Sequence, residues 1–176
     1  ETLISLDINE DSCKTIEHNK QYFTNTKVLN ENIISYDYTK IPNHQYDVLL
    51  GGFPCVTFSV VGKQAGIKDD TNGKLYESYS RYVEYFKPKI FLAENVKGIL
   101  SANSGEAVKI IKKRFEDTGY KLKIFLVNFA DFGVPQLRER VLFIGIRKDI
   151  KTDFIPPEFT HKNNHLTVKE AFKDIN

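Results

Sequence analysis

Cys55 is the residue whose surroundings most strongly suggest covalent chemistry. It ends the run Gly51–Cys55, which follows an apolar stretch at 46–50 that is typical of a buried parallel strand. Glycines allow a ligand or a neighbouring backbone to approach closely, and Pro54 stiffens the turn. A thiol in such a loop becomes a nucleophile when a helix N-terminus or a cation lowers its pKa. A buried, inert cysteine is the alternative, and we expect it for Cys13 on a predicted helix face.

Polar side chains also follow three other predicted strands: Asp7, Asp37 and the pair Glu94-Asn95. In open α/β sheets, ligands bind beyond the carboxyl ends of the strands, so we expect these groups and Cys55 to meet at one rim. Asp7 could accept hydrogen bonds from ribose hydroxyls, although capping the helix that begins near Asn9 is an equally good interpretation. Glu94 could act as an acid or a base, or it could cap the turn that follows.

Donor groups gather at Gln136, Arg138 and Arg140, just before an apolar strand. In an extended chain these side chains share one face, where they would suit phosphates, a base carbonyl or the fixing of a catalytic loop. A solvated edge strand is the alternative, and the pattern alone favours it. His161 and His165 have the spacing of a metal pair only if they lie on a helix, and their surroundings predict a loop.

The elements that must position these residues alternate between strands and helices. The predicted strands are 3–7, 33–36, 46–50, 90–94, 122–127 and 140–146; the predicted helices are 9–18, 74–86 and 105–118, with another beginning at 166. Residues 52–73 show no periodicity and indicate a functional loop. The alternation predicts an α/β fold with a mostly parallel sheet and helices on both faces. We expect one domain over 1–155 and the start of a linker over 156–176.

Composition indicates a globular protein in a reducing compartment. Of 176 residues, 41% are hydrophobic and 27% are charged, and the net charge of +2 permits a nucleic-acid partner without arguing for one. The 2 cysteines are too few for a disulfide framework. There is no methionine, and the chain opens directly on a predicted strand. We expect a fragment, a processed chain, or a sequence from which modified methionines were omitted.

The order and spacing of these motifs resemble the cytosine-5 DNA methyltransferase family. Residues 51–59 resemble its nucleophile loop, Glu94–Val96 its base-recognition motif, 133–140 its Q-x-R-x-R motif, and 70–75 its Asp-x-x-Gly-x-Leu turn. The resemblance covers about residues 3 to 150 and implies a Rossmann-like, S-adenosylmethionine-dependent fold, here truncated. Val56 stands where most members have Gln. The glycine-rich cofactor motif, expected about 20 residues before Asp7, and the target-recognition region lie outside the sequence.

The resemblance also implies roles for particular residues. The expected cofactor-binding residues are Asp7 on the ribose hydroxyls, Ile8 on the adenine, Asp37 on the adenine amino group, Tyr38 beside it, and Pro54 and Leu75 along the pocket. The expected catalytic set is Cys55 as the nucleophile, Glu94 at the N3 edge of the base, Arg140 on the base carbonyl, Arg138, and Asn95, which holds the loop in shape. The expected DNA contacts are Ser59, Lys63 and Gln136.

Partners and alternatives follow from the same resemblance. It implies methylation of carbon 5 of a flipped-out cytosine in double-stranded DNA, with S-adenosylhomocysteine as product and no metal. We expect a monomeric cytoplasmic enzyme of a bacterial restriction–modification system, with no membrane partner and with a cognate restriction endonuclease as its protein partner. The nearest alternative is a tRNA cytosine-5 methyltransferase; a non-catalytic or split subunit, inactive alone, is another. A cysteine hydrolase with a Cys55–His44 dyad would bind no methyl donor.

Overall fold

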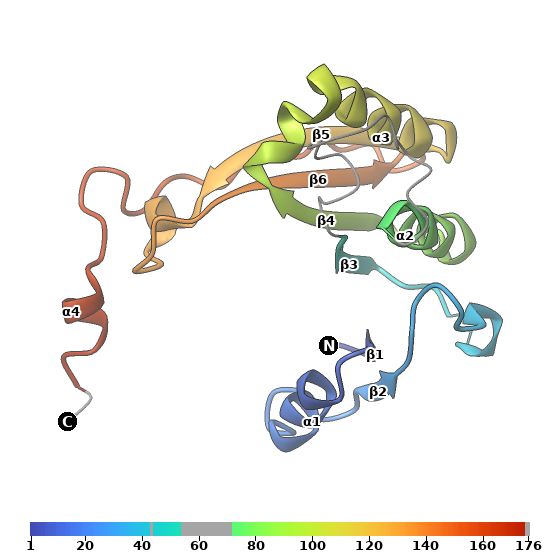
Figure 1. Ribbon diagram of the computed structural model, residues 1–176, viewed down its shortest axis with the longest axis horizontal. Coiled ribbons are helices and arrows are strands. Elements are labelled where there is room, and N and C mark those ends of the chain that lie inside the picture. The colour runs from blue at the N-terminus through green and yellow to red at the C-terminus, as the bar shows by residue number, and fades with distance from the viewer. Residues whose placement is uncertain (43, 54–71, 175–176) are drawn as a thin grey trace. The chain divides into compact units, whose positions relative to one another are not determined.

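The computed structural model describes residues 1–42, 44–53 and 72–174 of the chain, and the side chains of 72–74 are not described. It divides into two compact units, Glu1–Asn43 and His44–Asn176, and each is considered by itself (Figure 1). The predicted loop containing Cys55 therefore lies almost wholly outside the described residues.

The first unit is a strand–helix–strand arrangement. β1 (Ile4–Asp7) runs parallel to β2 (Lys27–Asn30), with Asp7 opposite Asn30, and α1 (Glu10–His18) connects them. Asn9 caps α1 by accepting a hydrogen bond from the Ser12 backbone N–H. Cys13 is buried at 4% exposure, and its thiol contacts the backbone oxygens of Asp7 and Leu29. These contacts fit the inert role expected for Cys13.

The prediction of a strand at 33–36 is wrong: the second strand of this unit is β2, Lys27–Asn30. Residues 33–35 form a turn instead. The Asn32 side chain accepts the Ile34 backbone N–H at 2.9 Å, and the Asn32 carbonyl accepts the N–H groups of Ser35 and Tyr36. An asparagine that bonds the following backbone competes with strand formation. The turn leads to the short 3-10 helix η1 (Tyr38–Lys40).

The second unit contains a four-stranded sheet in the order β3-β4-β6-β5. Its strands are β3 (Val48–Gly52), β4 (Ile90–Val96), β5 (Tyr120–Asn128) and β6 (Glu139–Arg147). β3 is parallel to β4, whereas β6 is antiparallel to both β4 and β5. Three strands therefore share one direction and only β6 of this sheet is reversed, which confirms the predicted α/β fold with a mostly parallel sheet.

Helices α2 (Asn72–Phe86) and α3 (Glu106–Asp117) pack on the same face of this sheet. The ring of Phe115 in α3 lies 4.3 Å from that of Phe91 in β4, and Tyr79 in α2 contacts both rings. A Cβ added to Gly51 would overlap Tyr79, and one added to Gly145 would overlap Phe91. Glycine at these strand positions thus makes room for aromatic side chains of the core, whereas at Gly51 the sequence had suggested close approach of a ligand or of neighbouring backbone.

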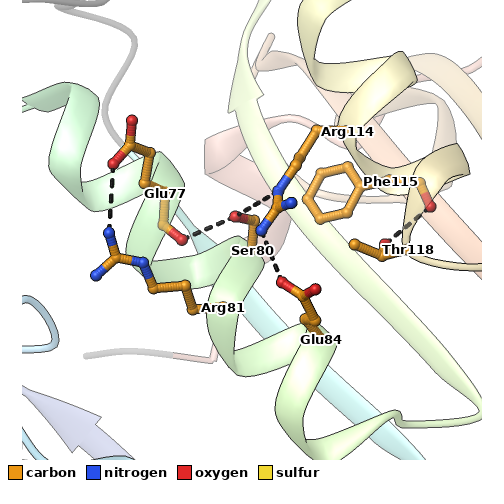
Figure 2. A network of polar contacts seen from close by, with 7 residues as sticks. All are labelled: Glu77, Ser80, Arg81, Glu84, Arg114, Phe115 and Thr118. Atoms are coloured by element: carbon orange, nitrogen blue, oxygen red, sulfur yellow. Dashed lines mark hydrogen bonds and ion pairs between the residues drawn. The ribbon is translucent and has the colours of Figure 1, made fainter.

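A polar network ties α2 to α3 at the edge of this core. Arg114 of α3 pairs with Glu84 at 2.7 Å and donates to the Ser80 hydroxyl at 3.3 Å. Ser80, only 1% exposed, in turn donates to the Glu77 carbonyl. Figure 2 shows how Arg114 reaches across to successive turns of α2. Because buried hydroxyls need partners, this arrangement fixes the register of the two helices.

The opposite face of the sheet is apolar but partly exposed. Leu49 belongs to the face that α2 and α3 cover, so the alternating neighbours Val48 and Leu50 point the other way and are 52% and 71% exposed. The expected full burial of this strand is therefore wrong for these two residues. Toward β5, Phe125 packs against Phe154 of the following segment. The prediction of helices on this second face stays a prediction, as do the domain limits at 1–155 and 156–176.

The remaining elements are short. They comprise η3 (Lys97–Leu100), η4 (Ala102–Gly105), η5 (Phe129–Phe132) and α4 (Val168–Ala171). Thr167 and Glu170 form a capping box at α4, as its sequence favours. The helix predicted from 166 nevertheless ends at Ala171, because it buries no residue and an isolated helix of this length has little stability of its own.

Candidate active site

Glu94 is the centre of a charged cluster at the carboxyl end of β4. Arg140 Nε lies 2.6 Å from Glu94 Oε1, and Arg138 Nη2 lies 3.6 Å from the same oxygen. The register explains this meeting: β6 places Leu142 opposite Glu94 and Arg140 opposite Val96, so Arg140 is the diagonal neighbour of Glu94 on one face. Glu94 is thus held by charge rather than by the helix-capping role that the sequence also allowed.

The Arg140 guanidinium is the better enclosed of the two arginines. Its side chain is 19% exposed, against 41% for Arg138. Its Nη1 donates to the Glu139 carbonyl at 2.8 Å. Its Nε is buried and lies 2.6 Å from Glu94 Oε1, so the two groups form an ion pair. The solvated edge strand that the pattern alone favoured is therefore not what forms at Arg138 and Arg140.

Asn95 points to the other face and is 2% exposed. Its Nδ2 donates to the Phe53 carbonyl at 2.8 Å, and its Oδ1 accepts the Val96 N–H at 2.9 Å. Phe53 is buried in the core and immediately precedes the segment that contains Cys55. A hydrogen bond from Asn95 to this position fits the predicted role of holding the loop in shape.

Asn128 is a positioning residue that sequence reasoning missed. Its Oδ1 accepts the backbone N–H groups of Ala130 at 3.2 Å and Arg138 at 3.1 Å. The Arg138 carbonyl accepts the Phe129 N–H at 3.0 Å, so both ends of the 129–138 loop are joined. The available signal was an asparagine directly after an apolar strand, where its side chain favours a turn.

An ion pair between Lys97 and Glu139 forms a second link between the Glu94–Val96 motif and the Q-x-R-x-R motif, beside the pairs of Glu94 with the arginines. Lys97 Nζ lies 2.9 Å and 3.0 Å from the Glu139 carboxylate oxygens. Both side chains are about half exposed, at 55% and 48%, so the pair contributes little to stability. It nonetheless joins the residue after the Glu94–Val96 motif to Glu139, which stands between the two arginines of the Q-x-R-x-R motif.

Asp7 and Ile8 lie at the carboxyl end of β1, in the first unit. Asp7 Oδ1 accepts the Asn9 N–H at 2.8 Å, which leaves Oδ2 without a partner among the described residues. Asn30 Nδ2 donates to the carbonyls of Asp7 and Ile8 at 3.1 Å and 3.0 Å. Ile8 itself is 68% exposed. A fixed carboxylate beside an exposed apolar side chain suits a ribose and a heterocycle, so these residues fit the nucleoside part of S-adenosylmethionine.

Asp37 is held at the start of η1. Its Oδ1 accepts the Thr39 hydroxyl at 2.6 Å and the Thr39 N–H at 3.1 Å. These bonds favour the charged form and lower the pKa of Asp37 below its ordinary value. A carboxylate that stays ionised can accept a hydrogen bond from an amino group, as expected for the adenine. Tyr38 follows within η1 and is half-buried.

Four of the remaining predicted site residues lie outside the described residues. Cys55, Pro54, Ser59 and Lys63 belong to the undescribed stretch 54–71. Leu75 packs against the hydrophobic core. Gln136 lies exposed in the bend before β6, so strand alternation does not place it beside Arg138. His161 and His165 lie in a loop as predicted, and in the described part of the chain no group of three or more candidate ligands could hold a metal.

Comparison with known proteins extends these observations. The family model for C-5 cytosine-specific DNA methylases matches residues 1–176. Type II methyltransferase M.NgoFVII of Neisseria gonorrhoeae is 46% identical over 136 residues, which cover 73% of this chain and 36% of that protein. Type II methyltransferase M.PspPI of Psychrobacter sp. (strain TA137) is 41% identical over 165 residues, covering 92% of this chain and 38% of that protein.

A solved structure gives the same indication for the fold. An Escherichia coli prophage protein described as a DNA modification methyltransferase matches with a TM-score of 0.75 at 24% identity, covering 98% of this chain and 48% of that protein. At that identity the likeness establishes the fold alone. The chain spans little more than a third of the length of the two sequence relatives. Among the described residues, no helix is both long and apolar enough to cross a membrane.

Proposed function

The chain belongs to the C-5 cytosine-specific DNA methylase family, and on that premise we propose that the protein transfers a methyl group from S-adenosylmethionine to carbon 5 of cytosine in DNA. The observation that carries the proposal is the Glu94 carboxylate held 2.6 Å from the enclosed guanidinium of Arg140. A carboxylate and a guanidinium side by side match the N3 edge and the carbonyl of a cytosine.

The reaction requires a base outside the helix, because the target carbon is inaccessible within a stacked duplex. The Cys55 thiolate adds to carbon 6 and forms a C–S bond, while Glu94 keeps a proton at N3 so that the ring does not accumulate negative charge. Arg140 binds the base carbonyl and orients Glu94. Carbon 5 becomes electron-rich and takes the methyl group. Loss of the proton from carbon 5 then re-forms the C5–C6 double bond and expels Cys55 as a thiolate.

S-adenosylmethionine supplies an electrophilic methyl group when it is bound and leaves as S-adenosylhomocysteine. Asp7 and Asp37 would hold its ribose hydroxyls and adenine amino group, and Ile8 would pack on the adenine. Leu75 and Pro54 would line the pocket, although the packing of Leu75 against the core limits it to a partial contribution. No step of the proposed chemistry requires a metal.

Double-stranded DNA is the proposed substrate, because the two sequence relatives are Type II methyltransferases and the family is one of DNA methylases. Ser59, Lys63 and Gln136 are the proposed DNA contacts within this chain. The exposure of Gln136 in the bend before β6 leaves it accessible for such a contact. A cognate restriction endonuclease belongs to the same proposal.

The decisive experiment traps the intermediate. The full-length protein is incubated with S-adenosylmethionine and duplex DNA that carries 5-fluorocytosine, because fluorine at carbon 5 blocks the final elimination. We expect a covalent adduct mapped to Cys55, and none with Cys55→Ala. Cys13→Ser is the matched control, since it removes the other cysteine of the chain but keeps a hydrogen-bond donor; it should still form the adduct.

The contrary outcomes are distinct. An adduct with fluorinated tRNA but none with DNA would replace the substrate class with RNA. An adduct that persists in Cys55→Ala would refute the assigned nucleophile. No adduct with either nucleic acid would refute the proposed activity and leave a non-catalytic subunit as the better description.

A further inference from the structure

A segment near the C-terminal end of the sequence packs against the turn that precedes Arg138 and Arg140. The turn is η5 with Gly133, and the segment is 159–165; we call this segment the brace. Phe159 packs on Phe132 with ring centroids 5.3 Å apart. The His161 backbone N–H donates to the Asp131 carbonyl at 2.8 Å. These contacts join parts of the chain that are nearly thirty positions apart.

Both histidines of the brace contact the turn through their rings. His165 Nε2 lies 2.8 Å from Asp131 Oδ1, and the Asp131 side chain is only 18% exposed. Gly133 has a φ of +86°, and a Cβ added there would lie 2.9 Å from His161 Cε1. The His161 ring therefore occupies the place that a side chain at position 133 would need. Its orientation is set by Thr160, whose Oγ1 lies 2.8 Å from His161 Nδ1.

Backbone hydrogen bonds connect the turn to Arg138. Gly133 N–H donates to the Ala130 carbonyl at 3.1 Å, and Val134 N–H donates to the Phe129 carbonyl at 3.2 Å. Phe129 and Arg138 are then joined directly and through Asn128, as described above. A continuous set of short contacts thus runs from His165 to the backbone of an arginine that faces Glu94.

We propose that His165 and Asp131 are positioning residues, which hold the 129–138 loop so that Arg138 and Arg140 meet Glu94 correctly; this rests on the proposed function of the Glu94 cluster. Neither residue touches the reacting atoms. Small misplacements of groups that orient a substrate lower the reaction rate strongly, and the 10 residues between β5 and β6 are long enough for contacts from another segment to add to their internal bonds. The brace supplies that support from outside the sheet.

The test measures loop order and activity separately in the full-length protein. His165→Ala removes the contact with Asp131, whereas His165→Gln keeps an N–H donor near the position of Nε2. Asn163→Ala is the matched control, because Asn163 is an exposed residue of the same segment. Amide hydrogen exchange over 129–138, which reports local opening, is expected to rise roughly three- to tenfold in His165→Ala. Asn163→Ala and His165→Gln should remain close to the parent protein.

Activity gives the second readout. His165→Ala should lower kcat for DNA methylation several-fold with an unchanged KM for S-adenosylmethionine, and His165→Gln should restore most of kcat. If amide hydrogen exchange over 129–138 is the same in His165→Ala as in Asn163→Ala, the inference that the brace holds this loop is refuted. Faster exchange with undiminished kcat would overturn the positioning role. If the parent protein methylates no DNA, the proposed function fails, and the exchange data still decide whether the brace holds the loop.

Discussion

Replacing Arg140 by methionine should cost the enzyme much more activity than the same change at Arg138. Methionine keeps an unbranched side chain of similar length but removes the charge, so Glu94 loses its partner at 2.6 Å. Hydrogen bonds and close contacts to charged groups contribute about 1.5–3 kcal/mol. The Glu94 side chain is 35% exposed, which screens the pair and favours the lower value. A loss of about 1.5 kcal/mol corresponds to roughly tenfold in kcat/KM.

The expected effect at Arg138 is smaller because its guanidinium lies 3.6 Å from Glu94 and is 41% exposed. Ion pairs of that kind contribute about 0.2–1 kcal/mol, so Arg138→Met should reduce kcat/KM by less than about fivefold. The two arginines are two residues apart, Arg140 in β6 and Arg138 just before it, which makes Arg138→Met a closely matched control for the loss of one positive charge.

The assay is steady-state methyl transfer to duplex DNA by the full-length protein, with thermal unfolding of each variant as a check on folding. Glu94→Gln is added to complete a double-mutant cycle. Once Glu94 is neutral, Arg140→Met should cost less than it does in the parent protein, because the ion pair is already lost and only the contact with the base carbonyl remains to be removed. A larger loss in Arg138→Met than in Arg140→Met, or full additivity with Glu94→Gln, would refute the inference that the short Glu94–Arg140 pair organises the site.

Two further predictions concern the core. Gly145→Ala should destabilise the protein by about 1–3 kcal/mol in urea unfolding, because the new methyl group would overlap the Phe91 ring. Gly98→Ala is the control and should change stability little, because there is open space around Gly98. Equal losses of stability in the two variants would contradict the packing argument. Burial raises the pKa of Tyr120 to about 12 in the folded chain, above about 10 for an unfolded tyrosine, so its contribution to stability is complete below about pH 10 and is lost as pH rises toward 12. Tyr120→Phe also loses the hydrogen bond to the Pro88 carbonyl; it should lower stability at neutral pH and flatten this alkaline decline in denaturant titrations, and an unchanged slope would contradict the assignment.

Local sequence signals were sufficient where an element is determined by its own side chains. The helix predicted at 74–86 forms as α2, because tyrosines, Val83 and Phe86 recur on one face and bury there, and Pro88 follows its end. The strand predicted at 90–94 forms as part of β4. By contrast, the predicted strand at 33–36 failed because a single asparagine, Asn32, bonds the following backbone and forms a turn.

The sequence by itself determined the α/β class, the order of most elements, and the family through motifs such as Glu94–Val96 and 136–140. It could not determine that Arg138 and Arg140 both meet Glu94, or that His165 reaches Asp131. Those contacts depend on β6 running antiparallel beside β4 and on the brace folding back over η5. Helices and turns arise from neighbours a few residues apart, whereas a charged pair across strands exists only once tertiary packing has fixed the register that brings its members together.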